Sequence, residues 1–351
     1  MSFLNIFSGF SEQLSSDIAI DLGTANTLVA IRGEGIVINE PSVVAIEKNT
    51  NRVLAVGHEA KNMINHTPDA FSAEHPLRDG VIADYDVTEA MLAAFINKAA
   101  PRKYPWSPKP RVVICIPCGA TSVEKRAVFE AAIQAGARTA YLIEEPMAAA
   151  MGAGLPVTDP TGSMVIDIGG GTTEVAIISL GGIVTSSSLR LAGNKLDEAV
   201  AAYLRNLLGI RIGERTAEVI KIKIGSILPF EDGRERDMEI SGQDASTDQP
   251  RAVIVQSEDV RAALEPPLQE MVLHIKDTFK KTNPDLASDI IHNGILLTGG
   301  GGLLAGLDRY LSDNLEIPVW TSETALTNVV AGCMNVLETP SALKQTLMRS
   351  R

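Results

Sequence analysis

Two stretches of the chain share one pattern. Residues 163–179 read S-M-V-I-D-I-G-G-G-T-T-E-V-A-I-I-S, and residues 17–31 read D-I-A-I-D-L-G-T-A-N-T-L-V-A-I. Each has an apolar run that leads into Asp, a Gly-rich turn with Thr, and a second β-branched run, which is typical of a β-hairpin with a polar tip. A copy of this motif in each half predicts two related domains.

The two hairpin tips predict a phosphate-binding site, because glycine lets a ligand approach backbone N–H groups closely. The candidate groups are Gly23, Thr24, Ala25 and Asn26 in the first tip, and Gly169, Gly170, Gly171, Thr172 and Thr173 in the second. Asp21 and Asp167 lie beside these tips, where a carboxylate suits a Mg²⁺ ion held mostly through water. A single copy would fit an ordinary glycine turn better, whereas two copies favour a triphosphate held from both sides.

The remaining pattern indicates an α/β fold, because strand-like and helix-like segments alternate along the chain. The expected strands lie at 36–39, 42–46, 112–117, 140–143 and 294–298, and the expected helices lie near 122–136, 146–154, 194–208, 215–225 and 257–281. Residues 229–251, rich in Asp, Gly, Ser and Pro, are expected to form a surface hairpin or loop.

Composition narrows the classes of function. The 351 residues carry a net charge of −12 without a block of Lys or Arg, so we expect no nucleic-acid partner. We expect a cytoplasmic protein, because the N-terminus lacks signal-peptide features and no apolar run reaches about 18 residues. The C-x-x-C at Cys115 and Cys118 ends an apolar run without a second pair, which favours two reduced thiols over a redox or zinc site.

Four segments together resemble the actin, Hsp70 and sugar-kinase ATPase superfamily. They are D-L-G-T-A-N-T (21–27), L-I-E-E-P-M-A-A-A (142–150), D-I-G-G-G-T-T-E-V (167–175) and L-T-G-G-G-G-L-L (297–304). Within it the chain is similar to the MreB family, through N-E-P-S-V-V-A-I (39–46), A-V-G-H-E-A-K-N-M (55–63), D-G-V-I-A-D-Y (79–85) and G-A-G-L-P-V (152–157). The resemblance extends from about Asp17 to Leu337.

The resemblance implies an actin-like fold of two related α/β domains around a central nucleotide cleft. Domain I would span 1–151 plus about 321–351, with a smaller subdomain near 38–79. Domain II would span 152–320, with a smaller subdomain near 190–251.

The resemblance also implies catalytic roles. Glu145 matches the position that orients the attacking water, and it is preferred to Glu144 because it directly precedes Pro146. Thr172 would help to position that water, and Asp197 matches a further carboxylate near metal and water. Positioning of this kind is most of what a protein contributes to phosphoryl transfer.

Two further segments are expected to hold the nucleoside of ATP. The first comprises Glu218, Val219, Ile220 and Lys221, in which Glu218 and Lys221 lie one helical turn apart. Taken alone, that spacing fits a surface ion pair better. The second comprises Gly299, Gly300, Gly301, Gly302 and Leu303.

The chain departs from the family pattern in two places. Ala192, Gly193 and Asn194 stand where G-G-D is common, which leaves the charge near the second tip in doubt. Cys118 stands where a small or apolar residue is expected.

Two segments are candidates for membrane contact. Phe3, Ile6, Phe7 and Phe10 recur at helical spacing, and Leu4 widens the stripe, which favours an interfacial anchor over a terminal helix docked on its own protein. In the loop 101–111, Tyr104 and Trp106 lie among basic residues, which favours contact with anionic headgroups over a surface loop with Trp106 packed inward.

The predicted function is an ATP-binding and ATP-hydrolysing cytoskeletal protein. The resemblance implies homopolymer filaments on the inner face of the cytoplasmic membrane, which direct wall synthesis with membrane proteins of the cell-elongation machinery and maintain rod shape. The alternatives are a sugar or acid kinase, for which we find no substrate-base motif, and a membrane-tethered adaptor, whose tether we would expect at the C-terminus. A chaperone ATPase would need a peptide-binding domain beyond Arg351.

Overall fold

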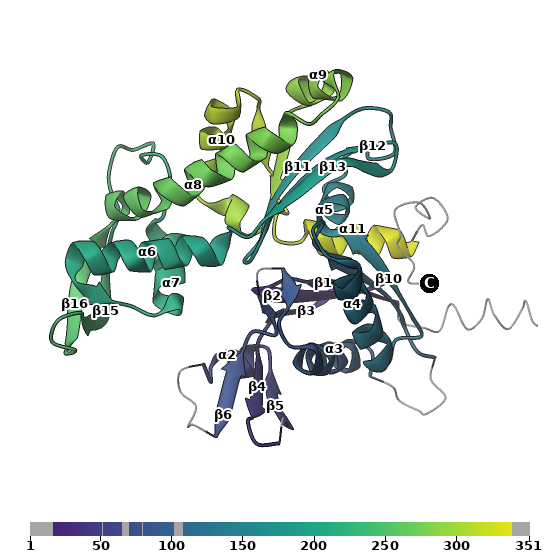
Figure 1. Cartoon of the computed structure of the whole chain (residues 1–351), viewed down its shortest axis with the longest axis horizontal. Helices are drawn as coiled ribbons and strands as arrows, with labels where there is room; N and C mark the ends of the chain where they lie inside the picture. The colour runs from purple at the N-terminus through teal and green to yellow at the C-terminus, as the bar shows by residue number, and fades with distance from the viewer. Residues whose placement is uncertain (1–16, 51, 65–69, 79, 102–107, 339–351) are drawn as a thin grey trace, which may run out of the picture. The chain divides into compact units, whose positions relative to one another are not determined.

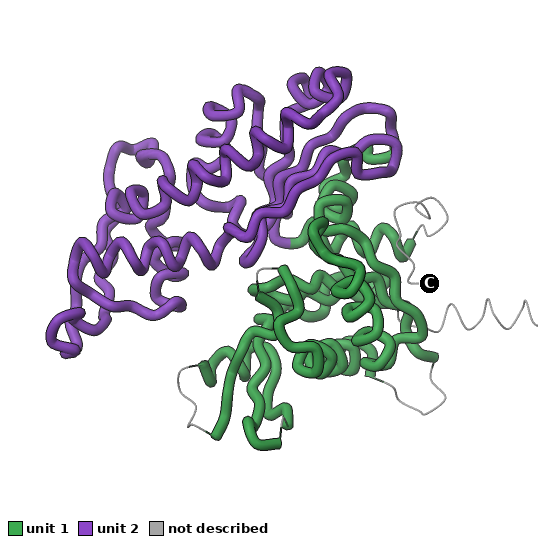
Figure 2. Tube along the Cα trace, viewed as in Figure 1, with its two compact units in different colours: residues 1–158, 327–351 green, residues 159–326 purple. Residues whose placement is uncertain are grey.

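The structure is a computed structural model that describes all residues except 1–16, 51, 65–69, 79, 102–107 and 339–351 (Figure 1). The chain forms two compact units, residues 1–158 with 327–351 and residues 159–326 (Figure 2). These divisions fall several residues after the predicted 151/152 and 320/321 boundaries. The predicted subdomain limits stay predictions.

The first unit is built on a five-stranded sheet in the order β10-β9-β1-β2-β3. β1 pairs antiparallel with β2 and parallel with β9. The strands are β1 (Ile18–Leu22), β2 (Asn26–Ile31), β3 (Gly35–Pro41), β9 (Arg111–Ile116) and β10 (Thr139–Glu144). Buried aliphatic residues run through β1 and β9, as expected for strands at the centre of a sheet.

The helices of this unit are α3 (Tyr85–Ala99), α4 (Ser122–Gln134), α5 (Glu145–Gly152) and α11 (Asn328–Glu338). α4 begins where the sequence predicts, because Thr121 and Glu124 form a capping box. A smaller sheet in the order β5-β4-β6 follows β3, from β4 (Val44–Glu47), β5 (Arg52–Val56) and β6 (Phe71–Glu74), with helix α2 (His58–Lys61). β7 (Leu77–Arg78) and β8 (Val81–Ile82) form a short hairpin.

The second unit repeats the first sheet's topology, with the order β18-β17-β11-β12-β13. β11 pairs antiparallel with β12 and parallel with β17, as β1 does with β2 and β9. The strands are β11 (Ser163–Ile168), β12 (Thr173–Ser179), β13 (Gly182–Leu189), β17 (Ile295–Thr298) and β18 (Val319–Thr321). The repeated sequence motif therefore forms the same pair of strands in both sheets.

Five helices and a second small sheet complete this unit. The helices are α6 (Gly193–Leu208), α7 (Glu214–Ile224), α8 (Ser257–Phe279), α9 (Pro284–Asn293) and α10 (Leu307–Leu315), and a 3₁₀ turn η1 spans Gly301–Leu303. The sheet is formed by β14 (Ile210–Arg211), β15 (Asp237–Asp244) and β16 (Pro250–Gln256). The segment expected as a hairpin or loop at 229–251 is thus a hairpin, whose strands extend to Gln256.

Candidate functional site

The first hairpin tip, called loop one, comprises Gly23, Thr24, Ala25 and Asn26 between β1 and β2. Two carbonyl groups of loop one, those of Gly23 and Ala25, accept hydrogen bonds from Ser42. Ser42 Oγ donates to Gly23 O at 2.5 Å, and Ser42 N donates to Ala25 O at 3.0 Å. A trans peptide group points its N–H opposite to its C=O, and every described peptide bond is trans. The N–H groups of Thr24 and Asn26 therefore point away from Ser42.

The second tip, called loop two, comprises Gly169, Gly170, Gly171 and Thr172, and it has the same arrangement with a different support. Gly193 N donates to Gly169 O at 3.1 Å and Asn194 N donates to Gly170 O at 2.9 Å, so the N-terminus of α6 fixes both carbonyls. By the same peptide geometry, the N–H groups of Gly170 and Gly171 point away from α6. Because the contact at Asn194 uses backbone, the departure from G-G-D leaves it intact.

Asp21 lies on β1 just before loop one, and Cys115 on β9 faces it. The Cys115 thiol donates to Asp21 Oδ1 at 3.2 Å. Burial raises the pKa of Asp21 to about 6, and the bond from Cys115 lowers it in part. Burial also raises the pKa of the Cys115 thiol well above its usual value, helped by a hydrogen bond with Cys333. The Cys115 thiol therefore keeps its proton and acts as a hydrogen-bond donor to the Asp21 carboxylate.

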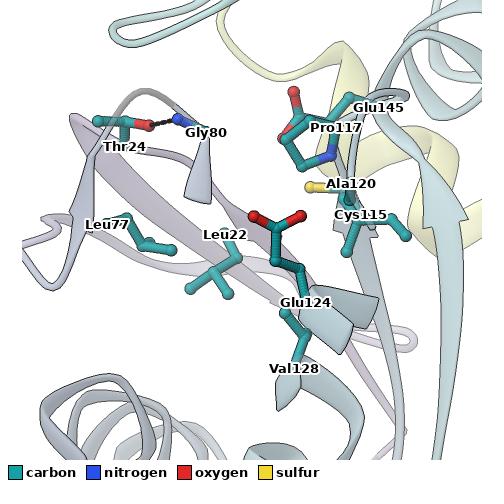
Figure 3. Close-up of a pocket in the computed structure, with 11 residues that line it drawn as sticks. Leu22, Thr24, Leu77, Gly80, Cys115, Pro117, Ala120, Glu124, Val128 and Glu145 are labelled. Atoms are coloured by element: carbon teal, nitrogen blue, oxygen red, sulfur yellow. Dashed lines mark hydrogen bonds between the residues drawn. The ribbon is translucent and has the colours of Figure 1, made fainter. Parts of the chain in front are cut away.

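The two adjacent glutamates of the E-E-P segment have different surroundings. Glu145, the first residue of α5, lines a small pocket together with Thr24, Gly80 and Cys115 (Figure 3). Gly80 N donates to Thr24 Oγ1 at 3.3 Å in the same pocket. Glu144 instead forms an ion pair with Lys125 at 3.5 Å. The preference for Glu145 as the residue that orients water stays a prediction.

Glu124 is the second carboxylate that lines this pocket, after Glu145. Figure 3 shows its side chain among the lining residues. The same side chain accepts from Thr121 N at 2.6 Å and from Thr121 Oγ1 at 2.8 Å. The capping box of α4 therefore explains the position of the Glu124 side chain.

Asp167 is the residue before the last in the buried strand β11, beside loop two, and is 5% exposed. Gly299 follows β17 and approaches it closely. A side chain at Gly299 would meet the Asp167 carboxylate and the Ile168 carbonyl, and its φ of +80° also favours glycine. Gly301 and Gly302, in η1, pack in the same way against Ile168 and Leu297. The glycine run at 299–302 thus brings this segment's backbone against loop two's strand.

Asp197 and Lys221 join α6 to α7. Lys221 Nζ lies 2.8 Å from Asp197 Oδ1 and donates to Gly193 O at 2.8 Å. Burial raises the pKa of Asp197 to about 6, although the charge and hydrogen bond of Lys221 oppose the rise; Glu218 and Glu214 add to it. Lys221 is thus tied to the same turn that supports loop two.

The other residues predicted to contact the nucleoside differ in their exposure to solvent. Glu218 and Val219 are partly exposed on α7, whereas Ile220 is fully buried in the core of the second unit. Gly300 and Leu303 are exposed. The structure brings Asp21, loop one and Glu145 together in the first unit, and Asp167, loop two, Asp197, Lys221 and residues 299–302 together in the second.

The membrane candidates Phe3, Leu4, Ile6, Phe7, Phe10, Tyr104 and Trp106 lie outside the described residues. Within the described part of the chain, no helix combines the length and apolar character needed to cross a bilayer. The same residues contain no cluster of three or more potential metal-ligating side chains.

Sequence reasoning missed three residues around loop one. Ser42 was noted only as part of N-E-P-S, Gly80 only as part of D-G-V-I, and Cys115 only as part of C-x-x-C. Each contacts the loop or Asp21 from a distant part of the chain.

The fold defines an actin-like protein. MreB5 of Spiroplasma citri, solved bound to ADP, superposes with a TM-score of 0.87 at 35% identity over 93% of this chain and 97% of that chain. Its AMPPNP-bound structure gives a TM-score of 0.88 over 94% and 98%. The MamK double helical filament shares the fold, with a TM-score of 0.76 at 22% identity over 92% and 99%.

The chain belongs to the MreB/Mbl protein family, whose model matches residues 15–345. It is 50% identical to the cell shape-determining protein MreB of Escherichia coli K12, over 94% of this chain and 95% of that protein. It is 47% identical to the cell shape-determining protein Mbl of Bacillus cereus, over 95% and 99%. The resemblance drawn from the sequence is confirmed: this is an actin-like cytoskeletal protein of cell shape.

Proposed function

We propose that the chain binds ATP with Mg²⁺ and hydrolyses it, and that each unit contributes its loop to phosphate binding. The observation that carries the proposal is the shared geometry of the two loops. In each loop two carbonyls accept hydrogen bonds from one side, those of Gly23 and Ala25 in loop one and those of Gly169 and Gly170 in loop two, so the N–H groups of the same peptide groups point the other way. Backbone amides arranged in this way suit an anion. The ADP-bound and AMPPNP-bound MreB5 structures support the choice of nucleotide.

In this proposal the residues of the chain have separate roles in hydrolysis. Glu145 orients the attacking water, Thr172 assists it, and Lys221 holds Asp197 beside loop two. Asp21 and Asp167 would hold Mg²⁺ largely through water, and the bound ion would neutralise charge that develops on the phosphates. Cys115 and Gly80 keep Asp21 and Thr24 in place.

The test of hydrolysis is a comparison of adjacent glutamates. Glu145→Gln keeps the size of the side chain but removes the carboxylate, so we expect phosphate release to fall by at least about 100-fold while ATP still binds. Glu144→Gln, which alters the carboxylate paired with Lys125, is the matched control and should hydrolyse ATP within a few-fold of wild type. Equal rates in both variants would refute the role of Glu145.

We propose further that the protein assembles into filaments that switch on ATP and lie on the inner face of the cytoplasmic membrane, where they act with the membrane proteins of cell elongation. A nucleotide that favours one arrangement of two domains can favour one set of subunit contacts. A short apolar N-terminal stripe would bind lipid weakly as a single copy, but an array of copies gains by avidity. The filament formed by MamK supports this proposal at the level of the fold.

A further inference from the structure

Ser42 lies between β3 and β4, where the chain leaves the large sheet of the first unit for the small one. It is fully buried, and its polar atoms are directed at loop one. Its hydroxyl donates to Gly23 O at 2.5 Å and shares a hydrogen bond of 2.9 Å with Thr27 Oγ1, and its N–H donates to Ala25 O at 3.0 Å. One residue thus contacts the loop at both flanks and at its middle.

The supports of the two loops differ in kind. In loop two the carbonyls of Gly169 and Gly170 accept from the backbone of α6, a helix of 16 residues. In loop one the carbonyl of Gly23 accepts from a side chain. A backbone support survives any substitution that keeps the helix, whereas the support at Gly23 depends on the hydroxyl of Ser42.

Gly23 makes that support important. A Cβ at this position would lie 2.6 Å from the carbonyl oxygen of Asn26, so only glycine fits. Glycine has more backbone freedom than any other residue. Without a donor to its carbonyl, the peptide group between Gly23 and Thr24 would rotate more freely, and the N–H of Thr24 would lose its fixed direction.

We infer that Ser42 is a positioning residue for phosphate binding: its buried hydroxyl fixes the carbonyl of Gly23 and thereby aims the N–H of Thr24 at the bound nucleotide's phosphates. The inference rests on the proposed function, because it needs loop one to bind phosphate. Ser42 itself does not contact the ligand. It acts through the loop, so its loss should weaken binding to the phosphates and leave binding to the nucleoside unchanged.

The test measures dissociation constants for ATP and for adenosine with the full-length chain. In Ser42→Ala we expect the ATP constant to rise roughly tenfold, a free-energy change of about 1.4 kcal/mol, while the adenosine constant stays within twofold. Ser42→Thr keeps the hydroxyl and should restore ATP binding. Ser226→Ala is the matched control, since Ser226 is also buried and its hydroxyl donates to the carbonyls of Leu228 and Ala305 in the second unit.

Each outcome decides a separate point. If the Ser42→Ala protein binds ATP within twofold of wild type, or if ATP and adenosine weaken equally, Ser42 has no positioning role and the proposed function stands. If wild type itself does not bind ATP, the proposed function fails first. Should Ser42→Ala not fold, Ser42→Cys takes its place, because a thiol fills the site but donates weakly; unchanged ATP affinity in that variant overturns the inference.

Discussion

Asp197 carries a carboxylate in surroundings that disfavour its charge. It is 4% exposed, lies beside Lys221 on α7, and faces Glu214 and Glu218 on the same helix. Burial is the largest cause of its raised pKa of about 6, against about 3.9 for an unperturbed aspartate. The folded state therefore binds a proton more tightly than the unfolded state between about pH 4 and pH 6.

This difference gives a pH dependence with a definite sign. Above pH 6 the folded protein holds a charged Asp197 at a cost, and the cost disappears as the pH falls through 6 towards 4. The stability of Asp197→Asn relative to wild type should therefore be higher at pH 8 than at pH 5. Urea unfolding at both pH values measures it.

An exposed aspartate in the same unit provides the control for this measurement. Asp313→Asn, on α10, should show little change in relative stability between pH 5 and pH 8. The relative stability of Asp197→Asn could instead be the same at both pH values, or lower at pH 8. That result would mean that Lys221 lowers the pKa of Asp197 at least as much as burial raises it.

The candidate site was predictable where one short segment supplies both the backbone and the chemistry. The Gly and Thr residues of both loops and the two aspartates stood out for this reason, whereas Glu145 was indicated only by the resemblance to the family. Ser42 and Cys115 did not, because their partners lie 19 and 94 residues away in the chain. Such contacts exist only once the strands have paired, so no local pattern records them. Ile220 shows a different limit of sequence reasoning. A whole segment was predicted to contact the nucleoside, but one side of its helix packs in the core, and Ile220 lies on that side.

Helices α5 and α11 of the first unit pack through glycine at the closest point. A Cβ at Gly332 would clash with the carbonyl oxygen of Ala148, and one at Gly152 would clash with that of Asn328. Gly332→Ala should therefore destabilise the protein by roughly 1–3 kcal/mol through overpacking, although alanine is the better helix former. Chemical denaturation measures the change.

The control for this prediction is Glu338→Ala, at the exposed end of the same helix, which should change stability by less than about 0.5 kcal/mol. A Gly332→Ala protein as stable as wild type would mean that the two helices are not in such close contact.

The membrane elements are tested together, because either one alone could hold the protein on lipid. A protein that lacks residues 1–10 and carries Trp106→Ser should no longer float with anionic liposomes, since it has lost both apolar contacts. The matched control is Trp320→Ser, which changes an exposed tryptophan of the second unit. Flotation of the double variant to the wild-type extent would refute the membrane proposal.

Helix and strand types followed from the sequence where the local pattern was strong. The capping box of α4 and the apolar runs of β1 and β11 are examples. The length of the hairpin formed by β15 and β16 did not follow, because its strands alternate between exposed and partly buried residues and carry many polar side chains. The pairing of β15 with β16 defines that sheet, and each strand places one aliphatic residue, Ile240 or Val255, in the core.

At the scale of the whole chain, the same sheet topology occurs in both units, and each copy presents a hairpin tip with outward N–H groups. The repeat in the sequence predicted this duplication, because the tip, its aspartate and its flanking strands recur as one block. The linkage between nucleotide and assembly has no motif of its own. We propose it on the physics of a ligand that prefers one of two conformations.

The most direct test of the account is negative-stain electron microscopy of the purified protein on an anionic lipid monolayer, with and without ATP and Mg²⁺. We predict membrane-bound filaments that form with ATP and Mg²⁺ and are absent or sparse without them. Dispersed particles well above micromolar concentration, in a preparation that still hydrolyses ATP, would contradict the claim that this chain is a nucleotide-switched filament protein.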